Sequence, residues 1–402
     1  MRPTAERATF RDVFAVSEFR ALWLAQVLSV AGDQLARVAL TVLVYDRTHS
    51  PLLAAVTYAS SIIPVFLGGI LLAGLADRFS RRTVMIGCDL ARALLVALMA
   101  LPGMPVAALV ALLFLVTMFG APFNSARSAI YPEVLSGDTY VLGTAVTLTT
   151  YQFAQVLGFV VGGAVVGFLG TRTSLLVDAA TFLASALLVR CGVRARPAPG
   201  GSVHLAASPL GDAIAGVRLV FGNAALLTPM LFGWLSAFYN VPEGLAAPFA
   251  KTLHGGAVTI GLILGAEAFG ASAGSVAFSR LVSPSRRQRL MGPLAIGASG
   301  ILVAMAFRPG LAVSLLILTV SGLCASFQLA ANAAFVRAAP QQQRSQAFGL
   351  AVAGMSLGQG AAMILAGAAA GYLSPAMVIA VSGAAGALAA TCLTVGWSRR
   401  VC

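Results

Sequence analysis

Seven ionisable side chains lie within long apolar stretches, where a charge is costly and usually has a function. They are Asp33, Arg37, Asp89, Arg92, Asp178, Glu243 and Glu267. A carboxylate that is charged in one conformation and neutral in another can carry a proton across a membrane. Glu267 has no basic residue within one helical turn, and Asp33 lies one turn from Arg37. We therefore expect Asp33 and Glu267 to couple protons, with Arg37 as the charge partner of Asp33.

Most of these groups also have an alternative interpretation. Asp33 and Arg37 can form a permanent ion pair, and Asp89 with Arg92, three residues apart, is expected to be structural. Asp178 is expected to be a packing or capping residue. Glu243 follows Pro242 and either binds a cationic substrate or reaches the outer water.

A cavity for an amphiphilic substrate needs apolar walls and a few polar groups. The candidates are aromatic and amide residues on the central apolar stretches: Gln26, Gln34, Tyr151, Gln152, Gln155, Trp234, Phe238, Tyr239, Asn240 and Gln359. A helix turns only about a third of its positions toward any one cavity. At least half of these residues are therefore expected to face neighbouring helices.

The chain that must position these residues has 402 residues, of which 59% are hydrophobic and 10% charged, against about 25% charged in soluble domains. Runs of about 20 apolar residues can cross a bilayer. We predict them near 20–44, 51–76, 83–101, 104–123, 141–168, 173–190, 224–248, 257–280, 290–307, 310–334, 345–370 and 375–396. The first 19 residues are too charged for a cleaved signal peptide, so the first helix is expected to remain as an anchor. The sequence thus predicts an all-α integral membrane protein with twelve transmembrane helices.

Basic residues between these runs indicate the orientation, because cytoplasmic loops retain Arg and Lys. The termini and even-numbered gaps hold 20, Arg127 among them, whereas the odd-numbered gaps hold four. Both termini are therefore expected in the cytoplasm. The expected organisation is a cytoplasmic segment (1–19), a six-helix bundle (20–190), a cytoplasmic linker (191–223), a second six-helix bundle (224–396) and a cytoplasmic tail (397–402).

A weak internal repeat supports two related halves. A shift of 208 positions places Asn332 on Asn124, Arg286 on Arg78, Arg289 on Arg81 and Pro340 on Pro132. Parallel halves related by an axis along the membrane normal are one repeat scheme of secondary transporters.

The segment GLADRFSRR, Gly74 to Arg82, follows the second apolar run. It resembles the cytoplasmic signature of the major facilitator superfamily, which Asp77, Arg78, Arg81 and Arg82 match, whereas Ala73 and Ser80 replace two glycines of that pattern. A reduced second copy, SRRQR, begins at Ser285. The resemblance implies two pseudo-symmetric six-helix bundles and a gating role for the four matching residues. The alternative is that the arginines only fix the topology.

Further resemblances point to export. The opening FRALWLAQVLSVAGDQLARVALTVLVYDRT and the segment NSARSAIYPEVL resemble bacterial twelve-helix exporters of drugs, macrolides or siderophores. Gly158, Gly162 and Gly163 resemble the antiporter motif of that superfamily, although Phe159 and Ala154 depart from it. Small residues four apart let helices approach closely in lipid. In that superfamily helices two, five, eight and eleven line the contact between the halves. The resemblance therefore implies that seven glycines pack the two halves together: Gly158, Gly162, Gly163, Gly270, Gly274, Gly354 and Gly358.

These features together predict a proton-coupled antiporter that exports a small amphiphilic compound across the bacterial cytoplasmic (inner) membrane, most simply as a monomer. An importer or facilitator, or a non-transporting sensor of the same fold, remains the alternative. An enzyme is disfavoured, because the three histidines fall in loops or span ends and no GxSxG or HExxH motif is present. No metal site or cofactor is expected. The net charge of +13 is spread between apolar runs and does not indicate nucleic-acid binding.

Overall fold

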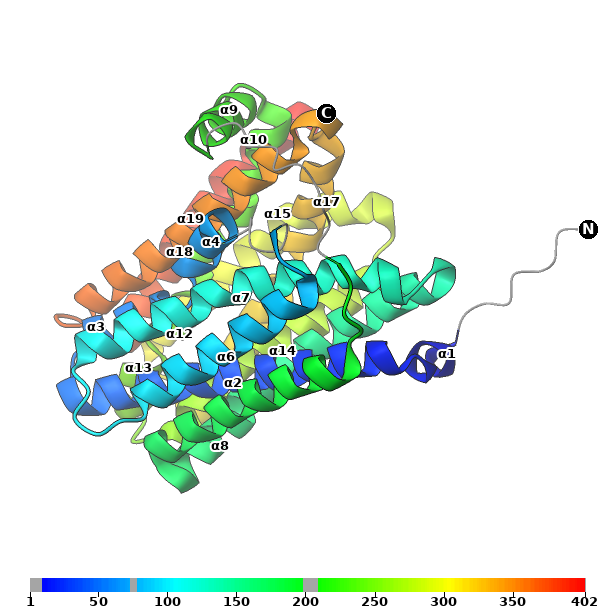
Figure 1. The fold of residues 1–402 in the computed structure, drawn as a ribbon. Coiled ribbons are helices and arrows are strands. Elements are labelled where there is room, and N and C mark those ends of the chain that lie inside the picture. Colours follow the sequence, from blue (N-terminus) through cyan, green and yellow to red (C-terminus); the bar gives the residue numbers. More distant parts are fainter. Residues whose placement is uncertain (1–8, 73–77, 198–208, 402) are drawn as a thin grey trace, which may run out of the picture.

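The computed structural model describes residues 9–72, 78–197 and 209–401, and every regular element in these ranges is helical (Figure 1). The first group of helices comprises α1 (Phe10–Ala15), α2 (Ser17–Thr48), α3 (Pro51–Ala59), α4 (Ile63–Leu71), α6 (Arg81–Met99), α7 (Val106–Val134) and α8 (Gly137–Gly192). After α9 (Pro209–Phe221), the second group comprises α10 (Ala224–Trp234), α11 (Ser236–Tyr239), α12 (Val241–Gly244), α13 (Ala246–Thr252), α14 (Ala257–Leu281), α15 (Pro284–Gly300), η1 (Ile301–Phe307), α16 (Leu311–Cys324), α17 (Phe327–Ala338), η2 (Gln341–Gln343), α18 (Arg344–Ala369) and α19 (Pro375–Val401).

Ten helical segments of the described ranges are long and apolar enough to cross a membrane. One of them, α8, has 56 residues and turns at Gly170, whose φ of 77° is readily adopted only by glycine, so it holds two spans. The 19-residue α6 is outside that set of ten because it carries Arg81, Arg82, Asp89 and Arg92. With α8 divided and α6 included, the predicted all-helical membrane fold with twelve spans is confirmed.

Two segments differ from the sequence prediction. The span predicted to end at 123 continues as α7 to Val134, because Ala126, Ile130 and Tyr131 extend its buried face past the polar Asn124. Arg127, assigned to a loop from the sequence, is therefore a buried helical residue. The segment expected as a linker, 191–223, contains the helix α9, which packs on α18.

The helices form two groups that pack mainly within themselves. In the first, α2 packs against α8 while α6 packs against α7 and α8; in the second, α14 packs against α16 and α15 against α19. Figure 1 shows the groups diverging toward the side on which α1 and the end of α19 lie. We call this side the terminal end, and the side where α2 ends and α3 begins the far end.

Contacts between the groups gather toward the far end. Lys251 Nζ of α13 lies 2.9 Å from Asp46 Oδ1 of α2. Helices α8 and α14 meet at Gly163 and Gly261, so closely that a Cβ on Gly163 would lie 2.9 Å from Gly261 Cα and 2.8 Å from the Ala257 carbonyl oxygen. A Cβ on Gly367 of α18 would likewise lie 3.0 Å from Leu52 Cα of α3. The structure is therefore closed at the far end.

The other glycines expected between the halves lie elsewhere. Gly158 and Gly162 of α8 approach Gln34 and Leu35 of α2, within the first group. Gly270 and Gly274 approach α16, while Gly354 and Gly358 approach Trp234 and Ala237, within the second group. Only Gly163 of the seven meets the opposite group here. Adjacent residues of a helix, such as 162 and 163, point in directions about 100° apart around its axis. Neighbouring glycines of α8 therefore contact different helices, one within the first group and one in the second.

The first span of each group has a different construction. Helix α2 runs unbroken for 32 residues, whereas its counterpart in the second group is divided into α10, α11, α12 and α13. Three prolines, Pro229, Pro242 and Pro248, lie in these four short helices. A proline removes one backbone donor and disfavours a straight helix.

We predict that Gly163→Val opens the far end. The added methyl groups have no space against Ala257 and Gly261, and overpacking of this kind costs about 1–3 kcal/mol. A reactive cysteine introduced at Asp46 should become more accessible to a water-soluble maleimide in the Gly163→Val protein.

The matched control is Gly87→Val on α6, where an added Cβ meets nothing within 4 Å. Unchanged labelling in both variants would show that the Gly163 contact does not hold the far end closed.

Candidate functional site

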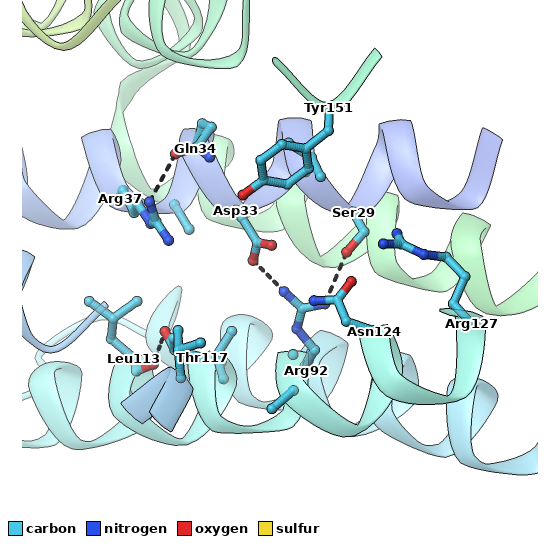
Figure 2. Close-up of a pocket in the computed structure, with 16 residues that line it drawn as sticks. Ser29, Asp33, Gln34, Arg37, Arg92, Leu113, Thr117, Asn124, Arg127 and Tyr151 are labelled. Atoms are coloured by element: carbon cyan, nitrogen blue, oxygen red, sulfur yellow. Dashed lines mark hydrogen bonds and ion pairs between the residues drawn. The ribbon is translucent and has the colours of Figure 1, made fainter. Parts of the chain in front are cut away.

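A charged pocket lies between α2, α6, α7 and α8 (Figure 2). Its cavity volume is about 150 Å³. The polar residues that line it are Ser29, Asp33, Gln34, Arg37, Arg92, Thr117, Asn124, Arg127 and Tyr151. Three guanidinium groups thus face one carboxylate inside a membrane-spanning bundle, which marks the pocket as a functional site.

Arg92 ties the charged pocket to the core. Its guanidinium forms an ion pair with Asp33 of α2, donates to Ser29 Oγ at 2.9 Å, and lies 3.8 Å from Asp89 Oδ1. Asp89 also accepts a hydrogen bond of 2.6 Å from Ser185 of α8. The Phe182 ring, with its centroid 4.1 Å from the Arg92 guanidinium carbon, covers the remaining face. Arg92 therefore joins α2, α6 and α8.

The expected direct pairing of Asp33 with Arg37 is not formed. Asp33 pairs with Arg92, and Arg37 donates instead to Gln34 Oε1 at 3.3 Å and to the Ser61 carbonyl at 3.4 Å. The side chains at i and i+4 share a helix face, but α6 brings a second arginine to the same carboxylate. The charge partner of Asp33 in this structure is Arg92.

A second set of charges spans the two groups. Glu243 lies on α12, which packs against α3, the helix that carries Tyr58, and against α14, the helix that carries Glu267. The cation whose charge acts on Glu243 is Arg37 of α2. Glu267 of α14 is only 6% exposed, and the charge that acts most strongly on it is that of Glu243. We call Glu243 and Glu267, which lie on the adjoining helices α12 and α14, the acidic pair.

A second, apolar pocket of about 320 Å³ lies in the second group, between α10, α14, α17 and α18. We call it the apolar pocket; its walls include Met230, Trp234, Phe335, Phe348 and Met355. Its polar members are Ser275, Gln328 and Asn332. The Trp234 indole donates to the Ala351 carbonyl at 3.0 Å, which fixes the ring in the wall.

The expected cavity residues divide between the pockets and the packing. Gln34 and Tyr151 line the charged pocket, and Trp234 lines the apolar pocket. Four others are engaged by neighbouring helices: Gln26 accepts from Tyr131, Tyr239 from Gln328, Gln359 donates to Ser236, and Phe238 is packed against the core. Gln152, Gln155 and Asn240 are partly buried and line neither pocket.

Asp178 is fully buried within α8 and is therefore not a helix cap. It packs where Gly32 of α2 leaves room, since a Cβ on Gly32 would lie 3.3 Å from Asp178 Cγ. Thr181 Oγ1 donates to Asp178 Oδ1 at 3.3 Å.

The expected gating hairpin lies at the terminal end. Asp77 is outside the described residues, and Arg78 is exposed. Arg81 donates to the Ala129 carbonyl at 2.9 Å and pairs with Glu133, both on α7, whereas Arg82 donates to the Arg190 carbonyl of α8. These two arginines bind the carboxyl ends of helices within their own group, where the helix dipole is negative.

Sequence reasoning missed Arg127, Tyr58 and Asn124 as site residues. The signal for Arg127 and Asn124 was present, because apolar residues at helical spacing continue to Tyr131. Tyr58 carries no such signal, since only the packing of α3 against α12 brings it to Glu243. Within the described ranges, no group of three or more His, Cys, Asp or Glu side chains is placed to hold a metal ion.

This fold is that of known transporters. The chain superposes on the nucleoside transporter NupG with a TM-score of 0.71 at 16% identity, covering 93% of this chain and 98% of that one. It also matches a bacterial homologue of the iron transporter ferroportin in an inward-facing state, with a TM-score of 0.66 at 15% identity over 95% and 98% of the two chains. The chain therefore has the fold of the major facilitator transporters.

The family is equally clear. Residues 10–399 match the major facilitator family MFS_3, described as transmembrane secretion effector, and the chain belongs to it. Curated relatives include the enterobactin exporter EntS of Citrobacter koseri, 25% identical over 71% of this chain and 70% of that protein. The multidrug efflux pump Tap of Mycobacterium tuberculosis is 26% identical over 74% of each chain. The expected resemblance to major facilitator exporters is thereby confirmed.

We predict that Arg92→Met destabilises the protein strongly, because it leaves Asp33 and Asp89 without their cation. Breaking a buried ion pair from one side costs about 3–5 kcal/mol. The apparent melting temperature of the purified protein in detergent should fall by several degrees.

The double variant Arg92→Met with Asp89→Asn should recover part of that loss, since it removes one of the two uncompensated carboxylates. Equal melting temperatures for wild type and Arg92→Met would contradict the role of Arg92 as the tie between three helices.

Proposed function

We propose that this transporter exports a small amphiphilic compound by proton antiport across the bacterial cytoplasmic membrane, with both termini in the cytoplasm. Two relatives named as exporters, of enterobactin and of multiple drugs, support the direction. The excess of arginine at the termini and in alternate loops supports the orientation. In this orientation the far end is external, and the structure is in a state open to the cytoplasm.

The two groups of helices act as the moving halves in this proposal, with 20–190 and 224–396 as the bundles and 191–223 as the connection. Parallel repeats related by an axis along the membrane normal rock about a central site. The hairpin residues Asp77, Arg78, Arg81 and Arg82 form the gate at the cytoplasmic side, which is open here.

The acidic pair is the observation that carries proton coupling. Glu243 and Glu267 lie on helices of the second half that pack against each other, α12 and α14, and α12 also packs against α3 of the first half, which carries Tyr58. Two carboxylates in low dielectric repel each other when both are charged, which favours one shared proton. Glu243 in its charged form attracts Arg37 and so stabilises the far-end closure.

A proton from outside then has a defined effect. Neutralising Glu243 removes its attraction to Arg37, which weakens the contact between α12 and the first half and favours opening at the far end. Substrate leaves as the proton enters. When the transporter returns to the cytoplasm-open state, the proton is released and the attraction to Arg37 forms again.

Asp33 is the second proton site in this proposal. It lines the charged pocket with its side chain 31% exposed and forms an ion pair with Arg92. Asp33 thus lies in the first half and the acidic pair in the second.

We predict that Glu267→Gln abolishes coupling without unfolding the protein. The glutamine keeps the size of the side chain but has no exchangeable acid proton, so Glu243 loses the partner with which it shares one. In proteoliposomes with an imposed pH gradient, a transported amphiphile should dissipate the gradient with wild type and not with Glu267→Gln.

Tyr239→Phe is the control, because it removes a hydroxyl near the acidic pair and leaves every carboxylate in place. Full proton movement in Glu267→Gln would exclude Glu267 from coupling. Substrate flux without proton movement in wild type would favour a facilitator, and binding without flux would favour a sensor.

A further inference from the structure

The charged pocket and the apolar pocket occupy equivalent places in the two repeats. Four positions that line the first pocket recur in the second at the spacing of 208: Gly120 with Gln328, Ala121 with Leu329, Asn124 with Asn332, and Arg127 with Phe335. Repeats related by an axis along the membrane normal place equivalent surfaces on opposite sides of that axis. The two pockets therefore lie on equivalent faces of the two halves, which we call the two walls.

Their chemistry is opposite. Arg127 stands where the second repeat has Phe335, so that a guanidinium in one wall corresponds to a benzyl group in the other. The apolar pocket is walled by two methionines and three aromatic rings, and its volume of about 320 Å³ suits a small aromatic body. A ligand that satisfies both walls needs one polar end and one apolar end.

The charge of the polar end follows from Arg127. This side chain is only 9% exposed, lines the charged pocket, and its Nε has no hydrogen-bond partner among the described residues (Figure 2). None of the ion pairs in the described ranges includes it, and the carboxylate whose field reaches it, Asp89, is already bound to Arg92 and Ser185. A buried guanidinium without an acid partner is costly unless a ligand supplies the anion.

Neighbouring groups fit the same anion. Asn124 is exposed in the pocket one helical turn before Arg127, and its amide can donate to the oxygen of an acid. Arginine binds carboxylate, phosphate and sulfonate groups through two parallel hydrogen bonds, which makes the recognition directional. Asp33, which would repel an anion, is neutralised by Arg92 in this structure.

We propose that the substrate is an amphiphile with one acidic group, a carboxylate, phosphate or sulfonate, which binds Arg127 and Asn124, while its aromatic or apolar body binds the apolar pocket. This inference rests on the proposed transport function and assigns its substrate class. It also assigns Arg127 and Phe335 as the residues that recognise the two ends of the substrate.

The test compares three probes that share one apolar body: naphthylacetate, naphthylacetamide and naphthylethylamine. Their affinities for the purified full-length protein are measured by titration calorimetry in a zwitterionic detergent without a pH gradient. We expect wild type to bind the anion about tenfold more tightly than the neutral amide, and the amide more tightly than the amine. Arg127→Met should abolish the preference for the anion with little effect on the amide.

Two variants serve as matched controls. Phe335→Leu, at the equivalent position, should weaken all three probes by a similar factor, because it removes contact with the shared body. Arg280→Met removes an exposed guanidinium of α14 and should change none of the affinities. If Arg127→Met fails to fold, Arg127→Lys replaces it. The order of the three affinities in wild type already shows whether the site prefers an acidic polar end.

The proposal is overturned if wild type binds the anion no more tightly than the amide, if it binds none of the probes, or if Arg127→Met weakens all three equally. Repeating the titration in nanodiscs with and without phosphatidylglycerol separates a soluble substrate from a lipid. Loss of probe binding in the anionic discs would assign Arg127 to a lipid headgroup instead. Since no pH gradient is applied, the preference for the anion is measured independently of proton antiport. Either proposal can therefore fail while the other stands.

Discussion

No water surrounds membrane-spanning helices, so other groups of the protein must compensate each buried charge. The pairing of the Arg92 guanidinium with Asp33 and Asp89 is the interaction on which the rest of the structure depends. The guanidinium has Asp33, Asp89, Ser29 and the Phe182 ring around it, and these groups come from three helices. The first half is therefore held together by polar contacts where apolar surface alone gives little drive to associate. The charged pocket exists because this arrangement leaves other arginines, Arg37 and Arg127, on its walls.

The same constraint separates the roles of the carboxylates. Asp89 and Asp178 are fully buried against their partners within the first half, as a structural role requires. Glu243 and Glu267, the acidic pair of the proposed mechanism, instead lie on helices next to the other half, since α12 packs against α3 and α14 against α8. In that mechanism a change of their charge alters a contact between the halves.

Much of the fold was predictable from the sequence, because a span needs only about 20 apolar residues and this signal is local. The site was predictable only as a set of residue types. Asp33 and Arg37 share a helix face, but the choice of Arg92 over Arg37 depends on where α6 packs, which no spacing within α2 encodes. Arg127 was misplaced because Asn124 and Ser125 look like the end of a span, although the buried face continues to Tyr131. The sequence predicted that the glycines lie at close helix contacts. It did not predict which helix each glycine contacts, since adjacent positions face different helices.

The division of the seventh span into α10, α11, α12 and α13 has a mechanical consequence. The short helices meet at Leu235, Asn240 and Leu245, and these residues are hinge positions at which backbone dihedrals can change. The continuous helix α2 has no such break and moves as one rigid element. Glu243 lies in α12, within the divided span, and Arg37 lies on the continuous helix α2. In the proposed mechanism, a movement of Glu243 is therefore confined to the short helices of the second half, whereas a movement of Arg37 displaces the whole of α2 in the first half. The two repeats thus differ in stiffness at equivalent helices.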